Sequence, residues 1–181
     1  MFRMKENEKT SYDLSHTTMV IKATESDGSW CSMILEEQKS SPLYVKKTPR
    51  KLIENNCRKN GEELLTRFDG ARILCGFNNK PPIAISVVKS LYYFPTHSPS
   101  NPQCSWFSHT HITDIKEAKY GGSTVLFRDG QTLDVDVSRS TMLNQLNRTA
   151  QFRFILEEQL KPIKKKGLLE ALLKALGYDI F

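Results

Sequence analysis

The stretch from Thr124 to Val137 constrains the fold more than any other part of the sequence. Its letters, TVLFRDGQTLDVDV, place two alternating segments on either side of Asp129-Gly130. Every second residue of the later segment is apolar, so one face of that segment suits a core and the other suits water. An Asp-Gly pair between alternating segments is the strongest short-range signal for a hairpin. The sequence therefore predicts antiparallel sheet here.

The N-terminal third carries the same kind of signal. The segments from Thr17 and from Trp30 to Leu35 flank Asp27-Gly28, which predicts a second hairpin, and Leu43 to Val45 predicts a further short strand. Thr48-Pro49 is typical of a helix start and Asn60-Gly61 of a helix end. Between them we expect a short basic helix whose buried face holds Leu52, Ile53 and Cys57.

Weaker patterns fill the rest of the chain. Residues 62–65 favour a helical turn ended by Asp69-Gly70, residues 83–94 are rich in strand formers, and a loop with three prolines follows. Trp106 to Ile115 alternates as extended structure does. Met142 to Leu160 has helical spacing, and we expect Pro162 with Lys164–Lys166 to break that helix before a last one, Leu168 to Leu176, capped at Gly177.

Together these patterns predict an α+β fold: a β-rich body of antiparallel hairpins with a short basic helix and C-terminal helices. A chain of 181 residues has the size of one domain. We expect a frayed N-terminus over residues 1–10, a domain over 11–160, and a basic linker with a C-terminal helix over 161–181.

The cysteines and the hydropathy indicate where such a chain works. The four cysteines are scattered without a CxxC pair, and no apolar N-terminal stretch resembles a signal peptide. No apolar run is long enough to cross a bilayer. We therefore expect a soluble protein of the reducing cytoplasm, with no membrane contact.

A formal net charge of +6 favours a polyanionic partner. The basic residues gather in three places: Lys46 to Lys59, with six Lys or Arg against Glu54 alone; the helix carrying Arg148 and Arg153; and Lys161 to Lys166. For any one cluster alone, a solvated face is the better explanation. Together they favour a contact with a phosphate backbone, because each neutralised phosphate releases counterions.

Two chemical alternatives arise around Cys104. Its spacing to His109 and His111 is that of a possible zinc or copper site, and His97 would supply a fourth ligand. A buried cysteine beside polar histidines explains the same residues. A Cys–His nucleophile would need an orienting carboxylate and an oxyanion hole, and no such signature is visible. No nucleotide-binding glycine motif occurs either. We expect no enzyme, no catalytic residue, no metal and no cofactor.

Residues 94–112 resemble the signature region of a known family. The stretch FPTHSPSNPQCSWFSHTHI contains a Pro-Gln-Cys triplet, a tryptophan and a Ser-His-x-His element, as the signature region of the bacterial competence transcription factor family, ComK, does. Further matches run in order through the chain: Ser11-Tyr12, Asp27-Gly28, Cys31-Ser32, Cys57-Arg58, Gly61, Lys80-Pro81-Pro82-Ile83, Phe127, Gly130, Thr132, Asn144-Gln145, Arg148-Thr149-Ala150 and Arg153. The resemblance thus covers roughly residues 11–153. It departs at Asn101, where the family more typically has arginine, and at Ser105, where glycine is usual.

This resemblance implies a DNA-binding activator of DNA-uptake genes. Members bind paired A/T-rich boxes largely through the minor groove, as a homo-oligomer assembled from dimers. The implied partners are double-stranded DNA, RNA polymerase and an adaptor that delivers the factor to an ATP-dependent protease. The implied location is the cytoplasm, in association with the nucleoid. A metal-binding protein using Cys104, His109 and His111, and a protein-interaction module that does not bind DNA, are the alternatives.

The interface residues follow from this hypothesis. We expect cationic side chains on phosphates or along a groove, at Arg58, Lys59, Lys80, Arg148 and Arg153. We expect polar side chains near base edges, at Asn101, Gln103, Ser108 and His109. The proline-rich loop of residues 98–103 could enter a minor groove, or it could serve only as a rigid connection.

The last predicted helix carries an apolar stripe, at Leu168, Leu169, Leu172, Leu173 and Leu176. A partner or a sister subunit could cover such a stripe. Packing on its own domain is the commoner outcome, and we expect it here.

Overall fold

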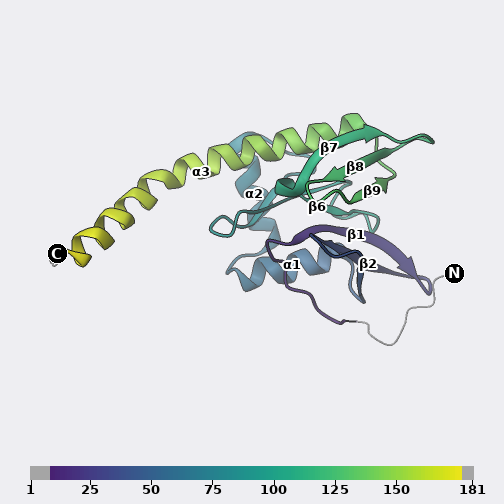
Figure 1. The fold of residues 1–181 in the computed structure, drawn as a ribbon, viewed down its shortest axis with the longest axis horizontal. Helices are drawn as coiled ribbons and strands as arrows, with labels where there is room; N and C mark the ends of the chain where they lie inside the picture. Colours follow the sequence, from purple (N-terminus) through teal and green to yellow (C-terminus); the bar gives the residue numbers. More distant parts are fainter. Residues whose placement is uncertain (1–8, 177–181) are drawn as a thin grey trace.

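The α+β fold is confirmed in a computed structural model that describes residues 9–176, apart from the side chains of residues 162–165. Two antiparallel sheets form the body (Figure 1). The larger has the order β3-β2-β1-β6-β5-β4 and consists of β1 (Thr18–Ser26), β2 (Ser29–Glu36), β3 (Leu43–Val45), β4 (Ile83–Ser86), β5 (Leu91–Pro95) and β6 (Trp106–Ser108). The smaller has the order β7-β8-β9 and consists of β7 (Ile112–Glu117), β8 (Ser123–Phe127) and β9 (Thr132–Val135).

Both predicted hairpins are present. β8 and β9 pair around the Asp129-Gly130 turn, and β1 and β2 pair around Asp27-Gly28. Asp27 and Gly28 have φ of 49° and 73°, as a two-residue turn between twisted strands requires. Residues 1–8, which hold most of the N-terminus predicted to fray, lie outside the described residues. Among the described residues, Lys9 forms an isolated parallel bridge with Val45.

The short basic helix is also confirmed, as α1 (Pro49–Lys59). The Thr48 hydroxyl accepts a hydrogen bond from the Lys51 N–H (3.3 Å), and Pro49 occupies the first turn. Leu52, Ile53 and Cys57 are fully buried, as predicted. They pack in a core with strands β1, β2, β4 and β6, which fixes α1 against the larger sheet.

The next helix, α2 (Leu64–Cys75), is longer than predicted. It continues through Asp69-Gly70 and ends at Gly76, whose φ is 69°. Phe68 and Ala71 lie on either side of the Asp-Gly pair and are buried, and the Phe68 ring stacks on Trp106 at 6.3 Å. This packing outweighs the weak helix propensity of Asp-Gly.

The extended structure predicted from Trp106 to Ile115 is interrupted. β6 belongs to the larger sheet and β7 to the smaller one, and a 3₁₀ turn, η1 (His109–His111), lies between them. The chain changes sheets at this point, so it cannot remain one strand. His109 and His111 therefore do not share a strand face.

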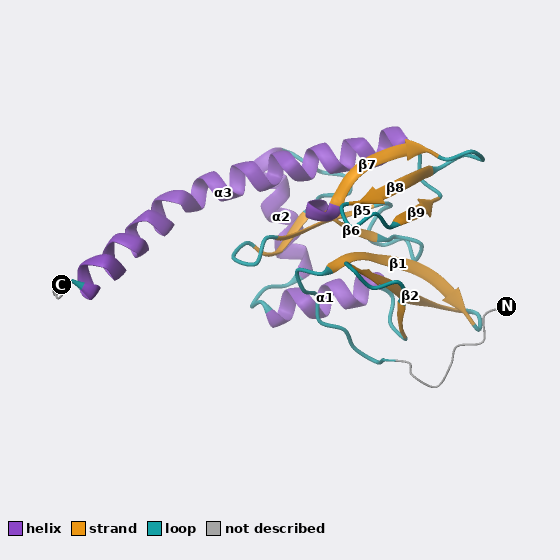
Figure 2. Ribbon diagram, viewed as in Figure 1, coloured by secondary structure: helices purple, strands orange, loops and turns teal. Residues whose placement is uncertain are grey.

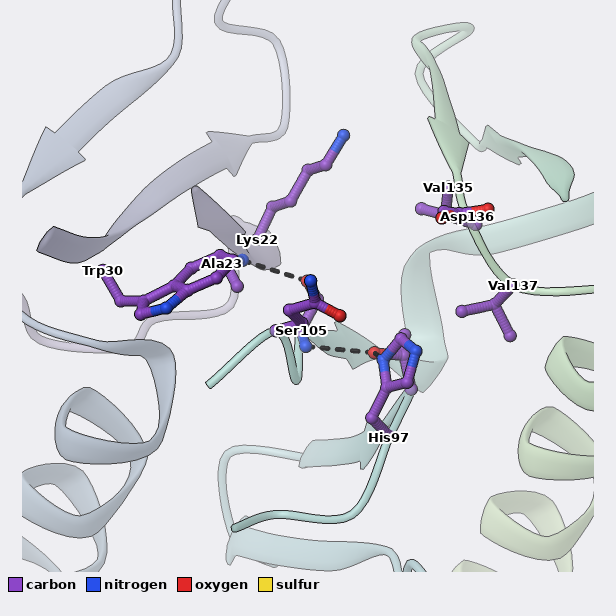
Figure 3. A pocket seen from close by; sticks show the side chains of 10 residues that line it. Lys22, Ala23, Trp30, His97, Ser105, Val135, Asp136 and Val137 are labelled. Carbon is purple, nitrogen blue, oxygen red and sulfur yellow. Dashed lines mark hydrogen bonds between the residues drawn. The ribbon is translucent and has the colours of Figure 1, made fainter. Parts of the chain in front are cut away.

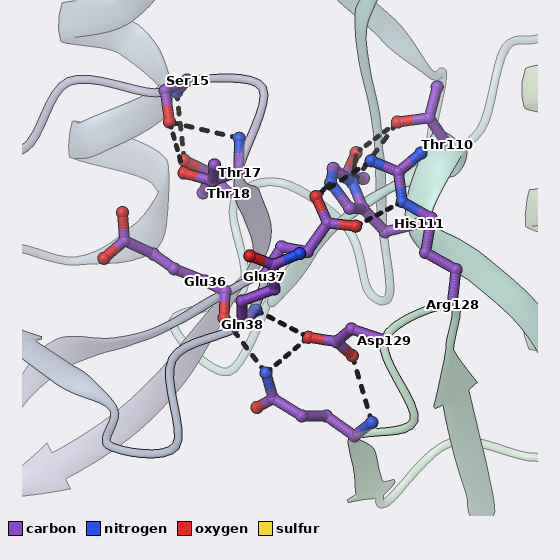
Figure 4. Close-up of polar contacts among 12 residues, drawn as sticks. Ser15, Thr17, Thr18, Glu36, Glu37, Gln38, Thr110, His111, Arg128 and Asp129 are labelled. Carbon is purple, nitrogen blue, oxygen red and sulfur yellow. Dashed lines mark hydrogen bonds and ion pairs between the residues drawn. The ribbon is translucent and has the colours of Figure 1, made fainter.

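The two sheets are joined by an apolar cluster and by a polar one. Phe107 stacks between Phe94 and Phe127, with ring centroids 5.9 and 6.4 Å away. Beside them the guanidinium of Arg128 donates twice to Glu37, at 2.6 and 3.0 Å, and the Asp129 carboxylate accepts from the Gln38 N–H at 2.9 Å (Figure 4). These contacts link the end of β2 to the β8–β9 turn and fix the angle between the sheets.

One long helix, α3 (Arg139–Ala175), ends the described chain, so the break predicted at Pro162 is wrong. Proline removes one N–H from the ladder, and an exposed helix tolerates this because water can satisfy the freed carbonyl. Figure 2 shows the first turns of α3 lying over the body and the rest projecting beyond it. The predicted cap, Gly177, lies outside the described residues.

The apolar stripe near the end of α3 does not pack on its own domain, contrary to expectation. Leu168, Leu169, Leu172 and Leu176 are 65, 57, 53 and 71% exposed. Among the described residues, no helix is both long enough and apolar enough to cross a bilayer, α3 included.

Candidate nucleic-acid interface

A hollow of about 200 Å³ lies between the β1–β2 hairpin and the end of β9 (Figure 3). Its walls come from three separate parts of the chain: Lys22, Ala23 and Trp30 from β1 and β2; Thr96, His97, Gln103 and Ser105 from the segment between β5 and β6; and Val135, Asp136 and Val137 from the end of β9 and the two residues after it. Ser105 ties two of the walls together. Its hydroxyl accepts from the Ala23 N–H and its own N–H donates to the Thr96 hydroxyl, each at 3.0 Å.

A second hollow is linked to the first through a hydrogen bond of Lys80. It is lined by Asn79, Lys80, Ser140, Thr141, Asn144, Gln145 and Arg148, from the loop before β4 and the first turns of α3. The Lys80 ammonium donates to the Thr96 carbonyl at 3.3 Å, and Thr96 lines the first hollow. We call the two hollows together the basic groove.

The charge of this groove is positive. Its lining includes Lys22, Lys80 and Arg148, against Asp136 as an acid. A concave surface lined by one sign of charge focuses the field and attracts an ion of opposite sign. The groove therefore suits a polyanion.

Arg148 is held firmly at the groove wall. Its guanidinium donates to Gln145 Oε1 (2.7 Å) and to the Asn79 carbonyl (2.6 Å), and lies 4.4 Å from the centre of the Phe77 ring. Partial burial lowers the pKa of Arg148, although an arginine remains charged at any physiological pH. Its position is thus fixed before any ligand binds.

The proline-rich loop is braced from within. The Asn101 side chain accepts from the Gln103 N–H (2.9 Å), and the Asn101 backbone carbonyl accepts from the Cys104 N–H (3.0 Å). Asn101 thus shapes the loop, whereas the exposed Gln103 side chain lines the groove.

His97 is a groove residue whose charge depends on its surroundings. Burial, and then the positive charge of Lys80, lowers the pKa of His97. His97 is therefore mostly neutral at pH 7, and its Nδ1 lies 3.0 Å from the Thr96 hydroxyl.

Of the predicted interface residues, Lys80, Gln103 and Arg148 line the groove and Asn101 braces its loop. Ser108 does not reach it, because Ser108 is 1% exposed and its hydroxyl lies 2.8 Å from His111 Nδ1. His109 is half-buried next to α3, where burial and then Arg153 lower its pKa.

The remaining predicted cations lie elsewhere and are paired with acids. Arg58 donates to Glu63 at 2.9 Å, and Lys59 pairs with Asp13. Arg153 donates to Glu157 at 2.9 Å and lies 5.3 Å from the centre of the Tyr92 ring. The basic charge that the sequence concentrates on α1 is thus largely balanced locally.

Sequence reasoning missed Lys22 and Trp30 as groove residues, and it named His97 only as a metal ligand. Lys22 and Trp30 lie on the β1–β2 hairpin, about 70 residues from the loop they face in the groove. Only pairing of β1 with β6 brings them together, through Val20–Phe107 and Ile21–Trp106. No local pattern reports such a pairing.

The metal alternative finds no support. Among residues 9–176, leaving aside the undescribed side chains, no three His, Cys, Asp or Glu side chains are placed to share an ion. Burial raises the pKa of Cys104 to about 11, and its thiol donates to the His97 carbonyl at 3.4 Å. Cys104 therefore behaves as a protonated core residue.

Comparison with known proteins agrees with this geometry. The family described as ComK protein matches residues 9–161. A protein of Bacillus subtilis (strain 168) named competence transcription factor is 32% identical over 143 residues, which are 79% of this chain and 73% of that protein. No solved structure matches. The match extends over the groove, both sheets and the anchored part of α3, and the chain belongs to the ComK family.

Proposed function

We propose that this protein is a transcriptional activator of DNA-uptake genes that binds paired A/T-rich boxes, largely through the minor groove. One observation carries the proposal: three cations from distant segments line two hollows that Lys80 links through the Thr96 carbonyl. Lys22 lines the hollow that also contains the Gln103 amide, and Lys80 and Arg148 line the other. The similarity to a protein named competence transcription factor supports the same function.

The proposed mode of reading follows from the shape and chemistry of the minor groove. A·T pairs present only acceptors there, adenine N3 and thymine O2, and a narrow A-tract groove concentrates negative potential. The Gln103 amide supplies donors to those acceptors. Lys22, Lys80 and Arg148 then neutralise the phosphates on either side.

The internal bracing of the loop matters for this mode. Asn101 holds the chain between Ser98 and Cys104 in one shape by backbone and side-chain hydrogen bonds. A loop that is already ordered loses little conformational entropy when it enters DNA. Asn101 thus acts indirectly, where an arginine would contact DNA itself.

We further propose that the chain acts as a homo-oligomer, with the projecting leucines of α3 as the contact. Two boxes in one site require two reading domains held together, and the exposed stripe at Leu168, Leu169, Leu172 and Leu176 offers an apolar surface for a second copy. RNA polymerase and a proteolytic adaptor are the other proposed partners. The proposed location is the cytoplasm, at the nucleoid.

The test is a binding titration by fluorescence anisotropy. Wild-type protein is compared on a duplex with two spaced A/T tracts and on a G·C-rich duplex of equal length. We expect Lys22→Ala and Lys80→Ala each to weaken binding to the A/T duplex about tenfold and to reduce the salt slope by about 0.9, as loss of one phosphate contact predicts.

Lys89→Ala provides the matched control, because Lys89 is an exposed lysine on the β4–β5 turn that does not line the groove. Gln103→Ala should reduce the preference for A/T over G·C more than it reduces overall affinity. Equal wild-type affinity for the two duplexes would refute sequence-specific reading.

A further inference from the structure

The tip of the β7–β8 hairpin, residues 117–122, presents an aromatic ring to solvent. Tyr120 is 90% exposed, and the Lys119 ammonium lies 5.3 Å from the centre of its ring. Within these residues Lys119 and Glu117 balance, and Lys116, just before them, pairs with Asp114 at 3.9 Å. The tip therefore presents an exposed aromatic ring with a cation beside it, a pair that can pack against a sugar–phosphate backbone.

Two consecutive glycines hold this tip in place. Gly121 and Gly122 have φ of 94° and 75°, which side chains rarely adopt. A Cβ at Gly122 would collide with the Val135 carbonyl. The backbone of the tip at Gly122 therefore lies directly on the end of β9, which anchors the turn that carries Lys119 and Tyr120.

The same contact makes the tip continuous with the basic groove. Val135, Asp136 and Val137 line the groove, and Gly122 rests on Val135. On the other side Arg139, in the first turn of α3, donates to the Ile115 carbonyl at 2.8 Å. Figure 1 shows the β7–β8 and β1–β2 hairpins projecting on the same side of the molecule.

We infer that this tip is a second DNA contact, which binds the sugar–phosphate backbone next to the segment held in the groove. Lys119 neutralises a phosphate there, and the Tyr120 ring packs on a deoxyribose while its hydroxyl donates to a phosphate oxygen. The inference rests on the proposed DNA-binding function. The tip would bind the DNA backbone that flanks the segment in the groove. Such a contact positions the protein on DNA but does not depend on base sequence.

The test combines protein variants with DNA length. Affinities are measured for one duplex trimmed to the two A/T tracts and for another extended by one helical turn at each end. The double variant Lys119→Ala/Tyr120→Ala should bind the extended duplex about tenfold more weakly than wild type, with the salt slope reduced by about 0.9. It should bind the trimmed duplex as wild type does.

The matched control is Val88→Ala/Lys89→Ala, an exposed apolar residue and a lysine on the β4–β5 turn, with Val88 91% exposed. It should match wild type on both duplexes. Wild-type affinity of the tip variant for the extended duplex would overturn the inference and leave the proposed function standing. Equal weakening on both duplexes would also overturn it, whereas a wild-type protein without A/T preference would remove the proposed function as well.

Discussion

The two halves of α3 meet opposite surroundings. Residues 139–156, the anchored half, bury Met142, Gln145, Thr149 and Phe152 against both sheets. Residues 158–176, the projecting end, leave four leucines more than half exposed. The first turns of this continuous helix therefore pack against the body, whereas its last turns form a separate exposed surface. The stability of the fold should depend on the anchored half alone.

The largest expected effect is the loss of a large core side chain from the anchored half. Phe152 is 4% exposed and packs with Ala71, Ala84 and Tyr92. Phe152→Ala should lower the free energy of unfolding by about 3–5 kcal/mol, measured by urea denaturation. Phe154→Ala, two residues on and 65% exposed, should change it by less than about 0.5 kcal/mol. If both variants lowered the free energy of unfolding by a similar amount, the contrast between buried and exposed faces of the helix would be wrong.

A buried amide should come next. Gln145 is 2% exposed, and its side-chain nitrogen donates to the Lys80 and Pro95 carbonyls at 3.0 and 2.8 Å. Gln145→Ala leaves both carbonyls without that donor, so urea denaturation should show a loss of about 1–3 kcal/mol. The exposed neighbour Asn144→Ala should show none. An unchanged Gln145→Ala would mean that the wall of the groove is held by other contacts.

Acidification should destabilise the body by a smaller amount. Burial, and then Arg128, lowers the pKa of His111, so the unfolded chain takes up a proton more readily than the folded one. The stabilisation is complete above the ordinary histidine pKa of about 6.5, and it falls by at most about 1.4 kcal/mol per pH unit below that. Urea denaturation at pH 7.5 and 5.5 measures the difference, which should shrink in His111→Gln. The projecting end contains no histidine, so its association should not change over this range.

The smallest effect on stability, and the clearest on association, should come from the projecting end. Leu172→Glu should leave the free energy of unfolding within about 0.5 kcal/mol of wild type. In sedimentation equilibrium, wild type should show the proposed concentration-dependent dimer and Leu172→Glu should not. Lys174→Glu places the same side chain on the opposite face of the helix and should retain the dimer. If the Leu172→Glu protein still dimerised, the dimer contact would have to lie outside the leucine stripe.

Local signals predicted the elements that depend on neighbouring residues. Asp27-Gly28, Asp129-Gly130 and Thr48-Pro49 each fix a backbone conformation within a few residues, and each lies where the sequence indicated. The length of α2 and the turn at His109–His111 depend on burial against Trp106 and on the change of sheet. Those are long-range contacts that no local pattern contains.

The same distinction applies to the interface. Lys80, Gln103 and Arg148 were predicted from clusters and from the family resemblance, and they line the groove. Arg58 was predicted on the same grounds but is paired with Glu63, because a charge count does not show which acids fold back onto a cation. Ser108 was predicted from its motif and is buried by the sheet it belongs to.

The unbroken path of α3 through Pro162 has a geometric consequence for how two sites on DNA could be coupled. A helix rises 1.5 Å per residue, so along its path Leu168 lies about 18 Å and Leu176 about 30 Å beyond residue 156, at the end of the anchored half. In the proposed dimer, where the leucine stripes of two copies meet, the length of this rigid arm would therefore set how far apart the two DNA-binding bodies lie.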